Sequence, residues 1–469
     1  MNRMKVKSGM AAPLLLAAMA LGASRADAAW TYDSSAGTLS DDSGTVLAVS
    51  VVTKYDVTGL QVNSVTSLGT NTDIDFTGFS TPGEGYRVIS FGGSAMSAKA
   101  ITSIVAPDAI SCGTSCFQTC TALTNAVFST FLYDIGVNSF LSCYYLDDFY
   151  PQTVSNVTTL GGRAFENASL KNVSFHFPAV TTCGAQAFYF NNPKKLTDFG
   201  PVEIVMTNVV TIGKIAMRGR SNTEVDGRMP NLVITSDDAA GQFNSTKIRE
   251  AYMPKVTHVT TEMFRSCSVL TNAVFSPDLE FLGQYAFLGC SSLRDVNHLL
   301  TPKIKTICMG ALYSCGIMDV VFNCPQIDCL TNQLFWTCSS LTNVVVKSHV
   351  DTLYDGCLTG LAPGVSIWFE NGAPSSVATN AITYVNPDNY HARARVYVRD
   401  SDLAASGFAS QLEPVVASDK TRSLNDWPGK RVRGKVKGWY TYKTSTSTTY
   451  RLSYYYIVGY PLGGIVIVQ

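Results

Sequence analysis

The sequence has few charges and, after its first 28 residues, no long apolar run. Charged residues make up only 15% of the chain, and 35 Lys and Arg balance 35 Asp and Glu. A membrane helix needs about 20 consecutive apolar residues, so we expect no transmembrane segment. The motifs GxSxG and HExxH, a phosphate-binding loop and an LPxTG-like anchor are also missing. These absences argue against an integral membrane protein and against the common hydrolase classes.

Clustered metal ligands are missing as well, although the chain has 13 cysteines and five histidines. No CxxC pair stands beside a second pair or a His couple, and the histidines fall at unrelated positions. We therefore expect no metal, no cofactor and no catalytic residue. A parallel β-helix that cleaves polysaccharides is the remaining enzyme alternative, with Asp147, Asp148 and Glu166 as its candidate carboxylates.

The two ends of the chain differ from its body. Residues 1–28 combine a basic start, an apolar stretch from about Met10 to Gly22 and small residues before Ala29, which predicts a signal peptide cleaved near Ala28. From Asp419 onward there are nine Lys and Arg against two Asp, which leaves residues 29–418 with a net charge of about −10. An acidic body with a basic tail does not indicate a nucleic-acid-binding protein. We expect a secreted or cell-surface protein.

One phrase recurs through the middle of the chain: an aromatic residue or Leu, two residues, often a Cys, two residues, and a Leu that opens a strand-like run. The first anchors are 23, 25 and 23 residues apart, and a later set is spaced by 23, 25, 23 and 23. The anchors are Phe117, Phe140, Phe165 and Phe188, then Phe264, Phe287, Leu312, Phe335 and Leu358. A fixed period of this length predicts stacked coils that share one continuous core.

The full phrase, IGxxAFxxCxxLxxVxF, resembles the BspA-like bacterial surface leucine-rich repeats over roughly Val88–Phe369. This resemblance implies a leucine-rich repeat fold and a non-catalytic role in adhesion or binding. The fold class we predict is a β-rich repeat solenoid with a cap at each end and a small C-terminal β module. Caps are expected because an end coil would otherwise expose its core.

The same pattern divides the chain into five parts. We expect a signal peptide at 1–28, an N-terminal β-rich cap at 29–87, a leucine-rich repeat solenoid at 88–370, a C-terminal cap at 371–418 and a basic aromatic β tail at 419–469. Within the C-terminal cap, the run VYVRDSDLAASGF predicts a strand followed by a short helix.

Six cysteines share the position three residues after the anchor: Cys120, Cys143, Cys267, Cys290, Cys315 and Cys338. A small residue that recurs at one inward position predicts buried free thiols, each of which fills space or meets a backbone carbonyl. Disulfides between successive coils are the alternative, since adjacent rungs lie within a bridging range of about 5 Å. Outside this set, Cys112 with Cys116 and Cys324 with Cys329 are the stronger candidates for bridges.

Two polar or small positions also recur. A Gly precedes each anchor in several coils (Gly136, Gly161, Gly213, Gly283), and we expect a positive φ there. Two residues after the strand-opening apolar residue stands Asn or Asp, which we expect to bond the backbone two residues on and to set the bend into the strand. A column of cation ligands is the alternative for these residues, which are Asn125, Asp148, Asn172, Asp198, Asn272, Asp295, Asp319 and Asn343.

Strand alternation predicts which side chains remain available outside the core. In LTNAVF, Leu123, Ala126 and Phe128 should point inward, which leaves Thr124, Asn125 and Val127 outside. The same registration exposes Val274, Val321 and Val345. Repeated apolar residues on one surface often mark a binding site, so we predict a partner-binding strand face, with plain β-propensity as the alternative.

The tail interleaves cations and aromatics: Lys430, Arg431, Arg433, Lys435 and Lys437, then Trp439, Tyr440 and Tyr442. Its alternation predicts two or three antiparallel strands. Such a surface could bind an anionic glycan or envelope polymer. The alternatives are a small sheet that docks on the acidic solenoid and a sorting signal.

Taken together, the sequence predicts a secreted or cell-surface repeat protein that binds an extracellular protein or glycan without catalysis. A structural scaffold component is the alternative, followed by the polysaccharide-active enzyme.

Overall fold

The computed structural model describes residues 29–171, 173–191, 201–219, 222–384, 394–412, 431–443 and 448–460. In the last two segments it describes the backbone, and of the side chains only Val458. The chain forms two compact units, one up to Val205 and one from Met206 onward. The predicted signal peptide at 1–28 lies outside the described residues, as do Asn172, Asp198 and Lys430.

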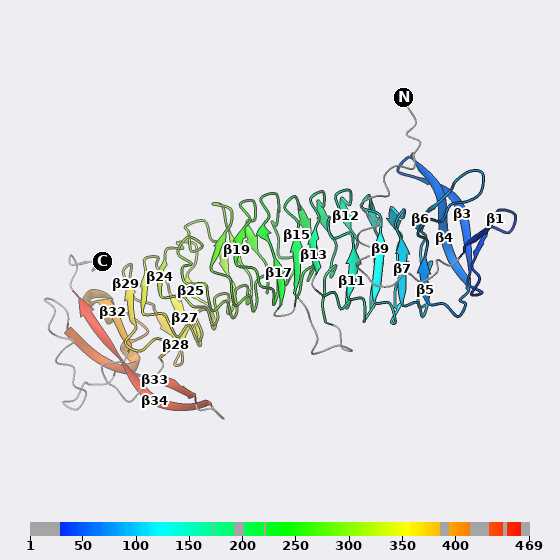
Figure 1. Cartoon of the computed structure of the whole chain (residues 1–469). Helices are drawn as coiled ribbons and strands as arrows, with labels where there is room; N and C mark the ends of the chain where they lie inside the picture. The colour runs from blue at the N-terminus through cyan, green and yellow to red at the C-terminus, as the bar shows by residue number, and fades with distance from the viewer. Residues whose placement is uncertain are drawn as a thin grey trace. The chain divides into compact units, whose positions relative to one another are not determined.

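The first unit begins with antiparallel strands (Figure 1, blue). They are β1 (Thr31–Asp33), β2 (Thr38–Ser40), β3 (Val46–Lys54) and β4 (Val57–Ser67). Strand β4 then pairs in parallel with β6 (Val88–Phe91), with Leu60 opposite Val88 and Val62 opposite Phe91. Because β4 covers the edge of β6, this segment closes one end of the parallel ladder that follows.

Each coil of the first unit contributes one longer and one short strand. Equivalent strands pair in parallel, except that the ladder of longer strands is interrupted between β11 (Asp148–Tyr150) and β13 (Val173–His176). The longer strands are β5 (Asp73–Asp75), β7 (Ser103–Ala106), β9 (Asn125–Phe128), β11 (Asp148–Tyr150), β13 (Val173–His176) and β15 (Val202–Val205). After β6, the short strands are β8 (Ser111–Cys112), β10 (Asp134–Ile135), β12 (Thr159–Leu160) and β14 (Thr182–Cys183). Register follows the repeat, with Asn125 opposite Asp148 and Ile135 opposite Leu160.

The second unit is built from coils of the same kind. Its longer strands are β17 (Thr223–Val225), β18 (Gly227–Arg228), β19 (Glu250–Tyr252), β21 (Asn272–Val274), β24 (Asp319–Phe322), β26 (Asn343–Val346), β29 (Ser366–Phe369) and β32 (Arg395–Arg399). Its other strands are β16 (Thr211–Ile212), β20 (His258–Val259), β22 (Phe281–Leu282), β23 (Thr306–Ile307), β25 (Cys329–Leu330), β27 (Thr352–Leu353), β28 (Leu358–Leu361), β30 (Ser376–Val377) and β31 (Ile382–Tyr384). The predicted strand and short helix are β32 and α2 (Asp400–Leu403), and a 3₁₀ turn, η2, follows at Ala409–Gln411.

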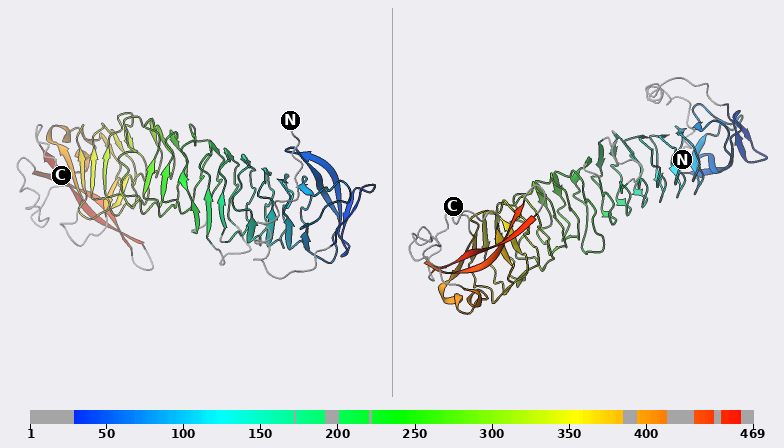
Figure 2. Two further views of the ribbon diagram at one scale, coloured as in Figure 1. Left: turned by 45° about the horizontal axis from the view of Figure 1, so that its top comes forward. Right: turned by 90° about the horizontal axis from the view of Figure 1, so that it is seen from below.

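The tail forms an antiparallel hairpin of β33 (Arg431–Lys443) and β34 (Thr448–Tyr460), as the alternation predicted. Strand β34 also pairs in parallel with β32, with Val396 opposite Ile457. The hairpin (red) therefore extends the sheet order β24-β26-β29-β32-β34-β33. Figure 2 shows it beside the last coils from two further directions. This pairing favours the docking alternative for the tail.

The turns, like the strands, bond to the next coil. Around Phe117, alternate backbone N–H groups donate along the stack: Ser115 N to Val137 O at 2.8 Å, Phe117 N to Ser139 O at 2.9 Å and Thr119 N to Leu141 O at 2.7 Å. The residues on either side of the anchor reach this geometry with φ of 56° and 57°. We call the place of Ser115 the first turn position; its equivalents include Asn138, Arg163, Gln186, Tyr285 and Gln333, all with positive φ.

The prediction of a positive φ at the recurrent Gly is wrong: Gly136, Gly161 and Gly283 do not have one. They are glycines because the backbones of successive coils touch there. A Cβ on Gly161 would lie 2.3 Å from the carbonyl carbon of Gly136, and one on Gly283 would lie 2.4 Å from the nitrogen of Thr261. Close approach, not chain reversal, selects glycine at this position.

The anchors form the stacked interior that the period predicted. In the first unit the Phe117 and Phe140 ring centroids are 5.2 Å apart, and Phe140 and Phe165 are 5.4 Å apart, with interplanar angles of 7° and 4°. Phe165 and Phe188 continue the column at 5.5 Å. In the second unit Phe264 and Phe287 stack at 5.4 Å. These rings, and Phe335, are fully buried.

The six repeated cysteines form the predicted inward ladder. Each thiol donates to the anchor carbonyl of the preceding coil, as Cys143 does to Phe117 O at 3.0 Å and Cys338 to Leu312 O at 3.1 Å. The same Phe117 carbonyl accepts the backbone N–H of Cys120 at 3.2 Å, so one acceptor serves two coils. All 13 cysteines are free thiols, including the pairs proposed for bridging, Cys112 with Cys116 and Cys324 with Cys329.

The Asn and Asp column behaves differently from the prediction. Of its described members only Asp295 bonds the backbone two residues on, accepting from Asn297 N at 2.9 Å. Asn125 instead donates to Ser103 Oγ of the preceding coil at 3.2 Å, and most other members begin a strand. The position therefore lies on the outer face of the strand ladder and not in a bend before it.

The glycine contact is tested by Gly161→Ala, which should lower the stability of the first unit by about 1–3 kcal/mol because the new methyl group must push two backbones apart. Gly93→Ala is the matched control, since its Cβ would meet nothing nearer than Thr114 O at 3.7 Å. Thermal unfolding monitored by circular dichroism measures both. Equal midpoints for the two variants would show that the coils do not touch at Gly161.

The thiol ladder predicts strong protection in the native state. Burial raises the pKa of Cys120 and of Cys338 to about 12 and that of Cys267 to about 11. Neutral buried thiols react slowly, so a thiol reagent at pH 8 should label mainly the half-buried Cys308 and Cys329 in folded protein, and all 13 after denaturation. Fewer than ten thiols in unreduced, denatured protein would contradict the ladder.

A pH dependence follows from the same pKa values. A thiol whose pKa is raised by folding contributes its stabilising effect below the unfolded pKa, and that contribution is lost as the pH rises toward the folded value. The midpoint temperature of thermal unfolding should therefore decrease as the pH is raised from about 9 to about 12. The Cys143→Ser variant, whose hydroxyl does not ionise in this range, should show a smaller fall.

Deletion of residues 413–469 should destabilise the second unit, because it leaves the β32 edge without its β34 partner. Val458→Ala provides a milder change, since Val458 is 1% exposed and its truncation should cost about 2 kcal/mol. Differential scanning calorimetry of both variants measures the effect. An unchanged transition after the deletion would identify the tail as an independent module.

Candidate binding surfaces

The strand face alternates as the sequence predicted. In β9, Ala126 and Phe128 are fully buried while Asn125 and Val127 are half-buried. Parallel pairing places Val127 opposite Val105 on one side and Tyr150 on the other, so the outward residues of successive coils form a row. Such rows are the surface that the core leaves available to a partner.

Thr124 does not belong to that row. It precedes β9, which begins at Asn125, and its Oγ1 donates to Thr102 O of the preceding coil at 3.0 Å. Thr271 and Thr342 make the equivalent bond to Arg249 O and Met318 O. Thr124 is exposed, and its hydroxyl group bonds one coil to the preceding one.

Two outward rows lie in the second unit. In the first, Val274 pairs with Tyr252, and Tyr252 pairs with Arg228. Tyr252 is 47% exposed, and Val274 is half-buried. This row presents a large aromatic side chain between a cation and an aliphatic one.

In the second row, Val321 pairs with Val345, and Val345 pairs with Trp368. Trp368 pairs with Tyr397, and their rings stack with centroids 3.7 Å apart and an interplanar angle of 4°. All four side chains are half-buried.

The predicted valines Val321 and Val345 thus form one end of a row whose other end is aromatic. Sequence reasoning missed Trp368, in the last strand of the repeat region, and Tyr397, which lies beyond that region, although SIWF and VYV alternate in the same way.

A loop separates these two rows. Residues 292–299 contain no strand, and two of their side chains bond the neighbouring sheet edges instead. His298 Nε2 donates to Ala273 O at 2.6 Å, and Asn297 Oδ1 accepts from Val321 N at 2.7 Å. The coil between β21 and β24 has no strand at this position, so each of the two strands is instead hydrogen-bonded by a side chain from that coil.

Of the three candidate carboxylates of the enzyme alternative, Asp147 and Glu166 each have a cationic partner. Asp147 forms an ion pair with Lys171 at 3.5 Å, while Glu166 lies 3.3 Å from Arg163 on a turn beside its anchor. Asp148 begins β11 on the outer strand face and is exposed. Partial burial raises the pKa of Glu166, and the Arg163 guanidinium opposes that rise. Asp147 directly precedes Asp148 at the beginning of β11, whereas Glu166 follows the anchor Phe165 of the next coil.

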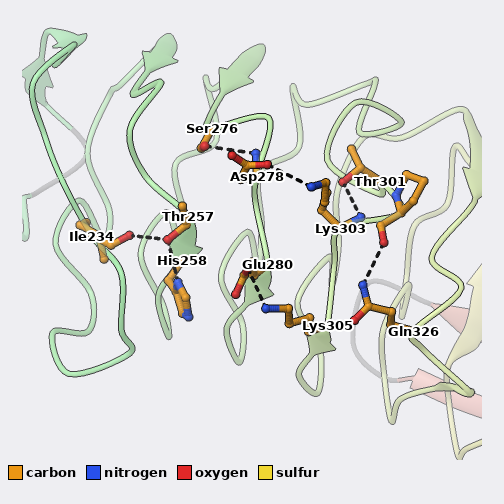
Figure 3. Close-up of polar contacts among 11 residues, drawn as sticks. Ile234, Thr257, His258, Ser276, Asp278, Glu280, Thr301, Lys303, Lys305 and Gln326 are labelled. Carbon is orange, nitrogen blue, oxygen red and sulfur yellow. Dashed lines mark hydrogen bonds and ion pairs between the residues drawn. The ribbon is translucent and has the colours of Figure 1, made fainter.

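Charges along the edge between the longer and short strands are paired between coils in the second unit (Figure 3). Asp278 contacts Lys303 at 3.4 Å, and Glu280 contacts Lys305 at 2.7 Å. Gln326 Nε2 reaches Pro302 O at 3.2 Å. Exposed pairs of this kind contribute about 0–1 kcal/mol each, so they fix the coil register weakly and leave a solvated polar edge.

The predicted tail residues lie on β33, apart from Lys430 outside the described chain. Arg431 pairs with Gly459 and Lys437 with Tyr454, while Trp439, Tyr440 and Tyr442 pair with Leu452, Arg451 and Thr449. Arg433 lies at a shift in register, and Lys435 pairs with Tyr456.

Among the described residues, no group of three or more His, Cys, Asp or Glu is arranged to hold a metal ion. The same residues form no helix that is long and apolar enough to cross a bilayer.

The match to a protein family agrees with this architecture. The chain matches the family described as BspA type leucine-rich repeat region, in six copies, over residues 86–195, 202–300 and 257–372. It is similar to a leucine-rich repeat protein from Bacteroides ovatus, with 14% identity, a TM-score of 0.27 and coverage of 72% of this chain and 97% of that one. A leucine-rich cell surface protein from Faecalibacterium prausnitzii has 14% identity and a TM-score of 0.34, with 81% and 93% covered. No curated protein matches the chain.

Proposed function

The chain belongs to the BspA-type leucine-rich repeat family, and on this premise we propose that it is an exported protein that binds an extracellular partner without catalysis. The partner is a protein or a glycan, and the strand face of the second unit is its contact surface. The protein acts at the cell surface or after secretion, with residues 1–28 as its cleaved export signal.

The outward rows of the strand face support this proposal most directly. Tyr252 is 47% exposed beside Arg228 and Val274, although nothing in the core requires an aromatic residue there. Tyr and Arg are the residues most enriched among those that contribute strongly to binding. The row from Val321 to Tyr397 adds aliphatic and aromatic surface in the same outward register.

The side edge of the coil offers a weaker alternative. There the charged groups of Asp278, Glu280, Lys303 and Lys305 already contact one another across coils. A partner that used them would have to break those pairs. The strand face imposes no such cost, which is why we place the partner there.

The experiment is an array of extracellular proteins and glycans probed with the mature chain, followed by Tyr252→Ser. Removal of a largely exposed ring should change stability little but weaken binding to the partner by about tenfold or more. Tyr354→Ser is the matched control, because Tyr354 is 45% exposed but lies outside the strand rows.

Unchanged binding by Tyr252→Ser, or an equal loss in both variants, would rule out the first strand row as the contact surface. A mature chain that retained no protein or glycan would instead favour the structural scaffold alternative.

A further inference from the structure

A second surface of the second unit lies on the turns and not on the strand face. Tyr285 occupies the first turn position of its coil, while Tyr313 and Trp336 each follow the anchor of the next two coils. The Tyr285 and Tyr313 rings meet edge to face at 6.4 Å, and Tyr313 and Trp336 are parallel within 9° at 6.1 Å. All three are half-buried. We call these residues the turn-side aromatic strip.

Two glycines of the first turn position make room for the strip. A Cβ on Gly310 would lie 2.4 Å from Cε1 of Tyr285, and one on Gly356 would lie 2.5 Å from Cε3 of Trp336. Positive φ alone does not explain these glycines, because Asn138, Arg163 and Gln333 carry side chains at equivalent positions with φ between 56° and 59°. The rings of Tyr285 and Trp336 therefore each lie over the turn of the next coil, in the space that a Cβ atom would occupy if Gly310 or Gly356 were another residue.

The side chain that hydrogen-bonds the strip is an uncharged amide. Tyr285 Oη hydrogen-bonds Gln333 Oε1 at 3.3 Å, across the coil that carries Gly310. Two sets of charged groups flank the strip: Asp355, which directly precedes Gly356 and is exposed, and Glu262 with its ion-pair partner Arg265 on the turn of the coil before Tyr285. Neutral rings with hydroxyl and amide groups at their margin, next to a carboxylate, suit a neutral polyhydroxylated ligand better than an anionic one.

The size of the strip also limits its ligand. Three half-buried aromatic side chains offer on the order of 250 Å² of surface. A stable protein interface takes about 800 Å² from each partner. The strip is too small to hold a folded protein alone, while an extended chain could contact one ring on each successive coil.

From these observations we propose that the turn-side aromatic strip binds a neutral polysaccharide, whose sugar rings place their C–H faces on Tyr285, Tyr313 and Trp336. This site is separate from the strand face. The protein would thus hold a glycan on its turns while the strand face contacts its partner.

Affinity electrophoresis of the mature chain tests this site, with dextran, mannan and xyloglucan as neutral probes and heparin as the anionic one. We expect retardation by at least one neutral polysaccharide and none by heparin. Trp336→Ala should raise the dissociation constant about three- to tenfold, the loss of one aromatic contact. Retardation by heparin alone, or by no neutral probe, would overturn the proposal.

Gly310→Asn provides a second variant that removes no aromatic residue. Asn tolerates this backbone, as Asn138 shows with φ of 58°, but its Cβ must displace the Tyr285 ring. Its polysaccharide affinity should fall while its unfolding midpoint stays close to that of the unaltered chain. Unchanged affinity in both Gly310→Asn and Trp336→Ala would contradict the proposal.

Tyr252→Ser separates this proposal from the one for the strand face. It should reduce binding to the array partner but leave polysaccharide retardation intact, whereas Trp336→Ala should do the reverse. A parallel loss of both activities in Trp336→Ala and Tyr252→Ser would show that the strip is not a separate site.

Discussion

Backbone hydrogen bonding from each coil to the next is the constraint on which the other features depend. It operates in the turns as well as in the strands: Ser115, Phe117 and Thr119 all donate along the stack. To direct alternate N–H groups this way, the chain takes positive φ on either side of the anchor. The close approach that results leaves no room for a Cβ at Gly136 or Gly161. The period, the glycines and the buried rings are thus consequences of one geometric requirement.

The stacked core could be predicted because its chemistry repeats in the sequence. Phe140 recurs as Phe165 at a fixed interval, and Cys143 keeps its place after the anchor, so both had to lie above their equivalents. The turn geometry could not be predicted in the same way. Positive φ occurs at Ser, Asn, Arg and Gln, which share no sequence signal. The recurrent Gly therefore led to a prediction of positive φ at the wrong position of the repeat.

The surfaces were less predictable than the core because outward positions are free to vary. Alternation placed Val127, Val321 and Val345 on the strand face, and the structure keeps them there as half-buried residues. Their continuation in Trp368 and Tyr397 depends on register with the last strand of the repeat region and with a strand beyond it. Likewise, Tyr285 and Trp336 belong to different positions of the repeat, and only coordinates show that each ring overlies a glycine of the next coil.

The loop at 292–299 shows how the solenoid can interrupt its ladder without losing its stack. Leu293 and Val296 remain buried in the core, so the coil is retained inside while its strand is absent outside. The backbone groups that a strand would have paired are bonded by His298 and Asn297. Because these side chains bond Ala273 O of β21 and Val321 N of β24, neither backbone group is available to pair with a strand of another chain. The strand face of the second unit therefore consists of two rows with a polar break between them, and a partner that used both would have to span a coil whose outer surface is loop.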